Sequence, residues 1–244
     1  MKTAIFIPAR MASTRLPNKP MADIAGLPMI VQVWKRAVEA ELGDVIVACD
    51  DLVIADAIHQ HQGKAILTDP NLPSGSDRIW AALQQIKDAQ SYDYIVNLQG
   101  DLPTLNPTLI HHVLEPLQNP DVEIATLATL IDNLEEVQNP NVVKIALALL
   151  PNEDIGRALY FSRTQIPAGV GPFYHHIGLY GYRQSALERF IKLAPSTLEQ
   201  RESLEQLRAL EAGMRIDVKL VDSCPLGVDT SEDLEKARLV LGDI

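Results

Sequence analysis

Short apolar runs alternate with longer amphipathic stretches in the N-terminal part of the chain, and this alternation narrows the folds open to it. The apolar runs, rich in Val and Ile, lie at 4–8, 45–49, 65–68 and 94–98, and the amphipathic stretches lie at 29–40, 52–60 and 77–89. Strands with few polar residues are typical of parallel sheets whose two faces are covered by helices. The pattern therefore predicts an α/β fold with a mostly parallel, Rossmann-like sheet.

The pattern changes after Asp101. A helix is predicted at 107–117 and longer strands at 123–131 and 142–150, followed by a stretch at 158–166 and a strand-like run at 177–182. Helices at 184–192 and 198–212, a strand at 215–221 and a helix at 231–241 complete the chain. We expect a single domain over 1–244, in which approximately 120–185 forms a smaller lobe.

Charge and composition exclude several classes of protein. The formal net charge of −11 argues against broad binding to nucleic acids or anionic membranes. No apolar stretch approaches the length of a membrane span, and the run before Pro8 is too short for a signal peptide. Cys49 and Cys224 lie far apart and form no Cys-x-x-Cys motif. We expect a cytoplasmic protein with neither a nucleic-acid nor a membrane partner.

A loop with three cations follows the first apolar run, at 8–20. Ligands of open α/β sheets bind beyond the carboxyl ends of the strands, which is where this loop is predicted to lie. Arg10, Arg15 and Lys19 could hold the phosphates of a nucleotide, and the Ser13 hydroxyl could donate a hydrogen bond to the same oxygens. The loop lacks the glycines and the ending of a Walker motif. The structural alternative is a solvated basic loop.

Two acids follow predicted strands or turns at distant places. Asp101 ends the run 94–98 through Gln99 and Gly100, and Asp229 precedes the last helix. Two carboxylates from separate loops suit magnesium, which fills its remaining coordination positions with phosphate and water. Taken alone, each aspartate is more often a turn-capping residue.

These motifs, taken together, resemble those of the 3-deoxy-manno-octulosonate (Kdo) cytidylyltransferases, also called CMP-Kdo synthetases. The resemblance begins with PARMASTRLPNKP at 8–20 and runs in order through nearly the whole chain. It continues with SGSDR at 74–78, VNLQGD at 96–101, NPNVVK at 139–144, ALYFSR at 158–163, HIGLYGYR at 176–183, LEQLR at 204–208 and GVDT at 227–230.

The resemblance implies a nucleotide-diphospho-sugar transferase fold, a homodimer formed through the smaller dimerisation and sugar-binding lobe, Mg²⁺ as cofactor, and CTP and Kdo as substrates. The implied CTP-binding residues are Pro8, Ala9, Arg10, Ser13, Arg15, Lys19, Ser74, Gly75, Arg78 and Gln99. The implied metal ligands are Asp101 and Asp229, which with Arg10 and Lys19 form the implied catalytic set. The implied sugar-binding residues are Arg163, His176, Tyr180, Glu205 and Gln206.

The implied reaction is an in-line attack by the anomeric hydroxyl of Kdo on the α-phosphorus of CTP. It releases pyrophosphate and yields CMP-Kdo for lipopolysaccharide biosynthesis. We expect magnesium on Asp101 and Asp229 to activate the hydroxyl, while Arg10 and Lys19 stabilise the departing pyrophosphate.

Three alternatives to this activity stay open. CMP-sialate synthetases usually carry Ser-Lys-Gly-Leu-Pro where this chain has STRLP at 13–17, which favours Kdo over sialic acid. An 8-amino analogue of Kdo is not separated from Kdo by these motifs. An inactive nucleotide-binding regulatory subunit is expected to have lost an acid or a loop cation, and both are present here.

The chain departs from the family pattern at two places. Many members have an acid after Gln-Gly-Asp, where Leu102 stands here, and the segment 168–173 is shorter than in many relatives. The implied sugar residues also have structural alternatives. The pair His175 and His176 could be one surface and one core residue, Tyr180 could belong to the core, and Glu205 with Arg208 has the spacing of a helix-surface ion pair.

Overall fold

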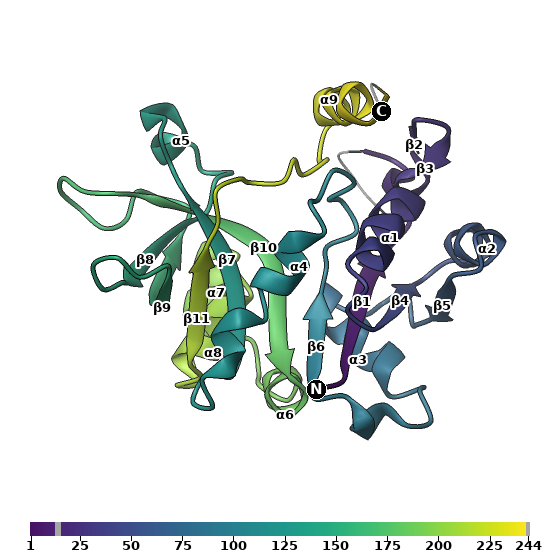
Figure 1. The fold of residues 1–244 in the computed structure, drawn as a ribbon, viewed down its shortest axis with the longest axis horizontal. Coiled ribbons are helices and arrows are strands. Elements are labelled where there is room, and N and C mark those ends of the chain that lie inside the picture. The colour runs from purple at the N-terminus through teal and green to yellow at the C-terminus, as the bar shows by residue number, and fades with distance from the viewer. Residues whose placement is uncertain (13–15, 243–244) are drawn as a thin grey trace. The chain divides into compact units, whose positions relative to one another are not determined.

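The computed structural model describes residues 1–12 and 16–242. The chain forms two compact units, and their elements are drawn in Figure 1. Unit 1 comprises Met1–His111 and Pro225–Ile244, and unit 2 comprises His112–Cys224. Unit 2 contains the whole of the smaller lobe expected at about 120–185 and adds three helices and a strand to it. That the two units act as one nucleotidyltransferase domain remains a prediction.

The sheet of unit 1 is parallel, as the apolar runs predict. Its strands are β1 (Thr3–Ala9), β4 (Asp44–Cys49), β5 (Lys64–Leu67) and β6 (Tyr94–Asn97), in the order β5-β4-β1-β6. Ile5 of β1 lies opposite Val45 on one side and Val96 on the other. The two central strands are almost wholly buried, which explains why they read as continuous apolar runs rather than alternating ones.

Helices connect these strands and begin at recognisable residues. The helices of unit 1 are α1 (Met29–Glu39), α2 (Leu52–Gln60), α3 (Gly75–Leu83) and α9 (Ser231–Gly242), with short 3₁₀ helices η1 (Lys19–Met21) and η2 (Ala89–Ser91); α4 (Thr108–His112) ends at the first residue of unit 2. Asp51 caps α2 by accepting the N–H of Val53 at 2.8 Å. Ser74 caps α3 by accepting the N–H of Asp77 at 3.1 Å. This cap sets the start of α3 at Gly75, and the helix is shorter than the 77–89 stretch predicted from the sequence.

A hairpin and the final helix complete unit 1. Strands β2 (Asp23–Ile24) and β3 (Leu27–Pro28) are joined by Ala25 and Gly26, both at positive φ, as two-residue hairpin turns require. Helix α9 buries Leu234 and Ala237 in one cluster with Ile24 and Met29. This packing holds the C-terminal segment in the same unit as the first strand.

Unit 2 holds a mixed sheet and corrects the prediction of a mostly parallel one. Its strands are β7 (Ile124–Leu130), β8 (Lys144–Ala148), β9 (Ile155–Ser162), β10 (Tyr174–Arg183) and β11 (Ile216–Leu220), in the order β10-β7-β11-β9-β8, with one further β10–β8 pairing. Within it, β11 and β7 are parallel, whereas the other pairs are antiparallel. Only six residues, 149–154, join β8 to β9, and so short a connection forces an antiparallel pair.

The helices of unit 2 are shorter than predicted. They are η3 (Glu115–Gln118), α5 (Leu134–Gln138), α6 (Gln184–Ile191), α7 (Thr197–Glu202) and α8 (Gln206–Glu211). The single helix predicted at 198–212 is divided into α7 and α8, because Ser203 adopts a left-handed conformation with φ of 56°. The helix predicted at 107–117 is likewise divided into α4 and η3.

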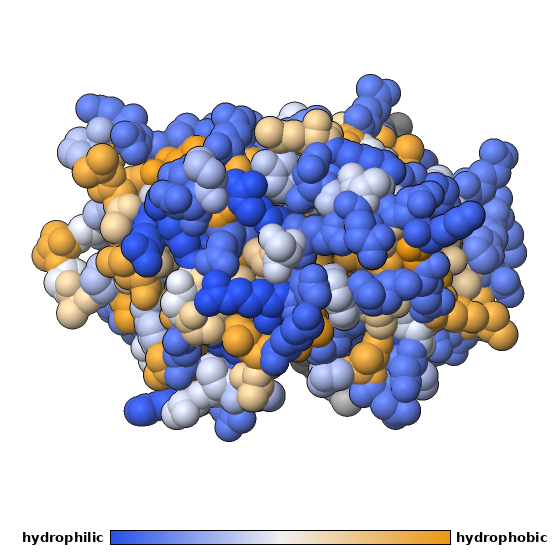
Figure 2. Space-filling view, turned by 90° about the horizontal axis from the view of Figure 1, so that it is seen from below, coloured by the Kyte–Doolittle hydropathy of each residue, from blue (hydrophilic) through white to orange (hydrophobic). Residues whose placement is uncertain are grey.

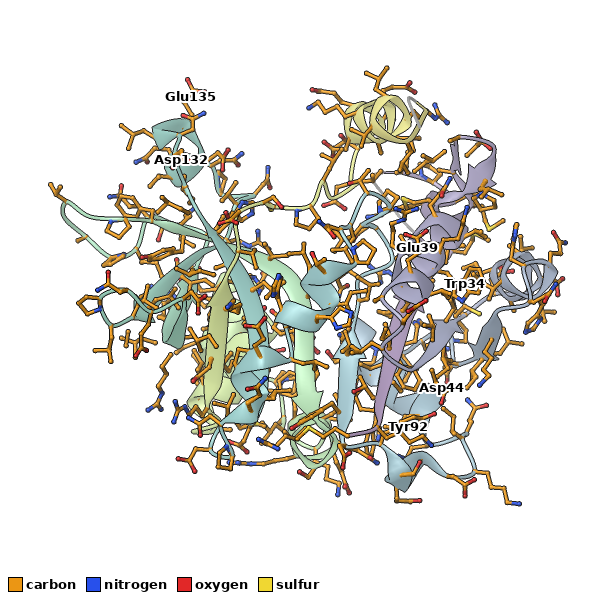
Figure 3. All side chains as sticks on the ribbon, viewed as in Figure 1. Trp34, Glu39, Asp44, Tyr92, Asp132 and Glu135 are labelled. Atoms are coloured by element: carbon orange, nitrogen blue, oxygen red, sulfur yellow. The ribbon has the colours of Figure 1, made fainter. Side chains whose placement is uncertain are left out.

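The surface carries the polar residues that the composition requires. Figure 2 shows one face of the molecule, on which hydrophilic side chains predominate and hydrophobic ones are scattered between them. Near the amino ends of the unit 1 strands, the Tyr92 hydroxyl donates a hydrogen bond of 2.7 Å to Asp44, and Figure 3 labels both residues. Burial and this carboxylate raise the pKa of Tyr92 to about 12. No helix in the described ranges is both long and apolar enough to cross a membrane.

Candidate active site

A pocket of about 350 Å³ lies in unit 1, where the loops after the parallel strands meet. Strand β1 leads into Arg10, β6 leads into Gln99 and Asp101, and the loop after β5 leads into Ser74. Loops at the carboxyl ends of parallel strands share one edge of the sheet, so distant residues become neighbours. The lining residues are Pro8, Ala9, Arg10, Ala12, Lys19, Pro20, Met29, Leu72, Pro73, Ser74, Gly75, Arg78, Gln99, Gly100, Asp101 and Asp229.

Two glycines allow the backbone segments of this pocket to approach each other closely. A Cβ atom on Gly100 would lie 2.8 Å from the carbonyl oxygen of Pro8, a distance that side chains do not tolerate. A Cβ atom on Gly75 would lie 3.2 Å from the Pro8 ring. The ends of β1 and β6 and the start of α3 therefore pack tightly around Pro8.

Lys19 joins the two aspartates at one side of the pocket. Its Nζ atom lies 2.7 Å from Oδ2 of Asp101 and 2.9 Å from Oδ1 of Asp229. Because both oxygens contact one nitrogen, they are at most 5.6 Å apart, the sum of the two distances. Burial alone would lower the pKa of Lys19, but the two carboxylates outweigh burial and raise it. The ammonium group is therefore charged and firmly held.

Neighbouring backbone contacts place the two aspartates. The carbonyl oxygen of Asp101 accepts the N–H of Val228 at 2.9 Å, which ties the loop after β6 to the loop before α9. Oδ2 of Asp233, in the first turn of α9, accepts the N–H groups of Asp229 and Thr230 at 3.2 and 3.0 Å. Asp229 is thus positioned by the beginning of a helix that is itself anchored in the core of unit 1.

Arg78 lies on the opposite part of the lining and is almost completely buried. Its guanidinium group donates to the Thr68 hydroxyl at 2.7 Å and to the Asp69 carbonyl at 3.3 Å, and it lies 3.9 Å from Asp50. Ser74 caps α3, as described above, and also donates to the Asp77 carboxylate at 2.7 Å. Both residues therefore have structural partners in addition to their place in the pocket wall.

The pocket gathers most of the residues predicted to bind CTP. Eight of the ten line it, and these are Pro8, Ala9, Arg10, Lys19, Ser74, Gly75, Arg78 and Gln99. Arg10 has an exposed side chain, whereas Lys19 is partly buried. Ser13 and Arg15 lie outside the described residues. That these residues contact a nucleotide remains a prediction.

Sequence reasoning missed several members of the pocket region, among them Asp50. Its carboxylate accepts the N–H of Met11 at 2.9 Å and faces Arg78. The signal was present, because Asp50 follows the buried strand β4 directly, just as Asp101 follows β6 through a short turn. Leu72 and Pro73 carry a weaker signal, as part of a turn-rich stretch after β5.

The predicted sugar-binding residues all lie in unit 2, and three of them are neighbours. The His176 and Tyr180 rings lie 5.4 Å apart between centroids, and the Glu205 carboxylate is close enough to raise the pKa of Tyr180 further, after burial and Tyr182. Burial lowers the pKa of His176 to about 3, so its imidazole is neutral. Gln206 is buried at the start of α8, next to Glu205.

Their surroundings show how the fold positions these groups. A β-bulge interrupts β10 between Ile177 and Tyr180. The Thr126 hydroxyl supports it, lying 2.9 Å from the Leu179 carbonyl and 3.0 Å from Nε2 of His176. Arg163 donates to the carbonyl oxygens of Glu202 and Pro140, at 3.0 and 3.1 Å. Arg208 pairs with Glu199, with 2.8 Å between Nε and Oε2.

The unit 1 pocket has the donor set that a divalent cation needs. Among the residues the structure describes, no group of three or more His, Cys, Asp or Glu side chains could hold a metal ion. Magnesium, however, takes one or two protein carboxylates and completes its shell with phosphates and water. Asp101 and Asp229 already converge on one positive charge, the ammonium group of Lys19. Their chemistry and spacing therefore fit such an ion.

Comparison with known proteins relates the chain to nucleotidyltransferases. Residues 4–216 match the model of the family described as "Cytidylyltransferase". The chain is 59% identical over 237 residues to a 3-deoxy-manno-octulosonate cytidylyltransferase of Paramagnetospirillum magneticum, covering 97% of this chain and 96% of the relative. It is 60% identical over 237 residues to the enzyme of the same name from Parvibaculum lavamentivorans, covering 97% and 92%.

Solved structures show the same relationship. The chain superimposes with a TM-score of 0.90 on a CMP:2-keto-3-deoxy-manno-octonic acid synthetase complexed with CTP, at 36% identity, covering 100% of this chain and 99% of that one. A 4-diphosphocytidyl-2C-methyl-D-erythritol synthase from Anaerococcus prevotii shares the fold, with a TM-score of 0.63 at 11% identity, covering 99% and 98%.

Proposed function

The chain belongs to the family of 3-deoxy-manno-octulosonate cytidylyltransferases, and we propose that it transfers CMP from CTP to Kdo, giving CMP-Kdo and pyrophosphate. The observation that carries this proposal is the unit 1 pocket, in which Arg10, Lys19, Asp101 and Asp229 gather at the carboxyl ends of parallel strands. The supporting structural neighbour was solved with CTP. As an activated sugar, CMP-Kdo would serve lipopolysaccharide biosynthesis.

In the proposed reaction, the anomeric oxygen of Kdo forms a bond to the α-phosphorus of CTP while the bond to the β-phosphate oxygen breaks. Charge develops on the departing pyrophosphate, and fixed positive groups nearby stabilise it. Arg10 and Lys19 are the cations of the pocket lining that we assign to this role, and Arg78 lines the same pocket. Ser74, Gly75 and Gln99 would shape the part of the pocket that receives the cytosine and ribose.

Asp101 and Asp229 are the residues that we propose to hold magnesium. When bound there, the ion would neutralise phosphate charge and lower the pKa of the attacking hydroxyl. The sugar would be recognised by Arg163, His176, Tyr180, Glu205 and Gln206, whose neutral imidazole and buried polar groups suit hydrogen bonds to sugar hydroxyls. A homodimer and a cytoplasmic location belong to the same proposal.

One assay tests the function. Pyrophosphate release is measured with each of the four nucleoside triphosphates, and Kdo, 8-amino-Kdo and sialic acid are offered in turn. We expect release with CTP and Kdo in the presence of magnesium, and almost none with sialic acid. Comparable turnover with sialic acid, or no release with Kdo, would contradict the proposal.

A further inference from the structure

We propose that Lys19 competes with a divalent cation for Asp101 and Asp229, so that the two acids bind the ion weakly until an anionic nucleotide draws the lysine away. This inference rests on the metal site assigned under the proposed function. It adds a role for Lys19 that precedes any contact with the departing pyrophosphate.

The competition follows from the geometry of one cluster in unit 1. The Lys19 ammonium group contacts one oxygen of each carboxylate, at 2.7 and 2.9 Å, and those oxygens are at most 5.6 Å apart. A divalent ion on the same oxygens, at about 2.1 Å from each, would lie next to the ammonium group. Two positive charges so close repel each other strongly in a partly buried site. The acids therefore hold one cation or the other.

The side chain of Lys19 can leave without any change in the backbone. Its main chain is fixed in η1, where the Lys19 N–H donates to Leu16 at 3.1 Å and the Ala22 N–H donates to Lys19 at 3.2 Å. The four-carbon stem of a lysine is flexible, so rotation about side-chain bonds is enough to move the ammonium group. Lys19 and Arg10 both line the same pocket, so a released ammonium group stays where a triphosphate is proposed to bind.

The exchange changes the charge of the pocket in a useful direction. With the lysine paired, Asp101, Asp229 and Lys19 together carry one net negative charge, which repels a triphosphate. With a divalent ion on the acids, the same three residues and the ion carry one net positive charge. The metal ion and the nucleotide should therefore assist each other's binding, and such coupling is reciprocal.

Binding of Mn²⁺ alone tests the competition without any turnover. Free Mn²⁺ is followed by electron paramagnetic resonance while the nucleotide-free protein is titrated. We expect Lys19→Met to bind Mn²⁺ at least about tenfold more tightly than the wild type, because a competing charge has been removed. Lys35→Met, which removes an exposed lysine on α1, is the matched control and should bind as the wild type does. Adding Asp101→Asn to Lys19→Met should abolish the gain.

Two further measurements make the outcome unambiguous. Circular dichroism melts show whether Lys19→Met is folded, and Lys19→Gln, which keeps an N–H donor without the charge, replaces it if it is not. A folded variant that binds Mn²⁺ no more tightly than the wild type would overturn the competition. Pyrophosphate release by the wild type tests the reaction separately: if release fails while the Mn²⁺ gain is observed, the proposed reaction is wrong and the competition stands.

Discussion

The Asp50 carboxylate accepts a hydrogen bond from the backbone N–H of Met11 at 2.9 Å and lies 3.9 Å from the guanidinium group of Arg78. One buried acid at the end of β4 thus connects the loop that carries Arg10 with the base of α3. This relationship assigns Asp50 a positioning role in the pocket, although its own side chain does not line it.

Replacement of Asp50 should weaken CTP binding more than it affects Kdo. We expect Asp50→Ala to raise the KM for CTP roughly tenfold, about 1.4 kcal/mol, because Met11 loses its acceptor and the buried Arg78 loses a nearby negative charge. Asp50→Asn, which keeps an acceptor oxygen, should have a smaller effect. Steady-state kinetics with each substrate varied in turn measure the difference.

The neighbouring acid is the control for this experiment. Asp51 caps α2, so Asp51→Ala should cost about 1 kcal/mol of stability while leaving the KM for CTP unchanged. Equal changes in KM for the two variants would show that Asp50 has no specific role.

Asp101 and Asp229 should act as one unit. Asp101→Asn and Asp229→Asn preserve size but remove a charge, and each should lower kcat by roughly 100-fold or more if a metal ion is lost. Because both acids are proposed to hold the same ion, the double variant should be far more active than the product of the single effects predicts. Asp56→Asn, on the exposed face of α2, should have no effect on kcat.

Multiplicative losses in this cycle would contradict a shared ion. The distance condition for sharing is already met, since the nearest oxygens are at most 5.6 Å apart, within reach of one ion after modest closure.

The buried imidazole of His176 should make stability depend on pH. Burial lowers its pKa from 6.5 to about 3, and the neighbouring His175 lowers it further. Between these values the unfolded chain binds a proton that the folded chain does not. The free energy of unfolding should therefore fall as the pH falls below 6.5, by up to about 1.4 kcal/mol per pH unit from this group.

Urea unfolding between about pH 7 and about pH 5 measures this slope, relative to variants that lack the group. His176→Gln should have a shallower slope than the wild type, whatever its absolute stability. His59→Gln, at an exposed position on α2, should keep the slope of the wild type. Identical slopes for His176→Gln and the wild type would show that His176 is not a buried neutral group.

The close approach of Gly100 to β1 should not tolerate a side chain. Gly100→Ala places a Cβ atom 2.8 Å from the Pro8 carbonyl oxygen, and a backbone atom can yield only if the strand ends separate. We expect a loss of about 1–3 kcal/mol of stability and a lower kcat/KM for CTP. Gly242→Ala, in α9 with open space around it, should be neutral or slightly stabilising. Full stability and activity in Gly100→Ala would contradict the close packing of the pocket floor.

Local patterns in the sequence were enough to predict much of unit 1. Helix α2 begins and ends where its amphipathic stretch predicts, and the four parallel strands fall within a residue or two of the apolar runs. Arg10 and Asp101 could be assigned to the carboxyl ends of strands for the same reason, because the end of an apolar run marks the end of a buried strand. The family motifs then indicated the reaction, and the comparisons confirmed the family.

The remaining features depend on contacts between distant residues. Lys19 and Asp229 are 210 positions apart, and they meet because Leu234 and Ala237 of α9 bury their side chains against Ile24 and Met29. The hydrogen bond from Met11 to Asp50, the bulge before Tyr180 and the mixed sheet of unit 2 likewise depend on which surfaces pack together. Sequence periodicity determined which residues are buried, strand or helix, because those preferences act over a few residues. Only the tertiary structure decided that one lysine contacts both aspartates, because that requires long-range burial of apolar surface.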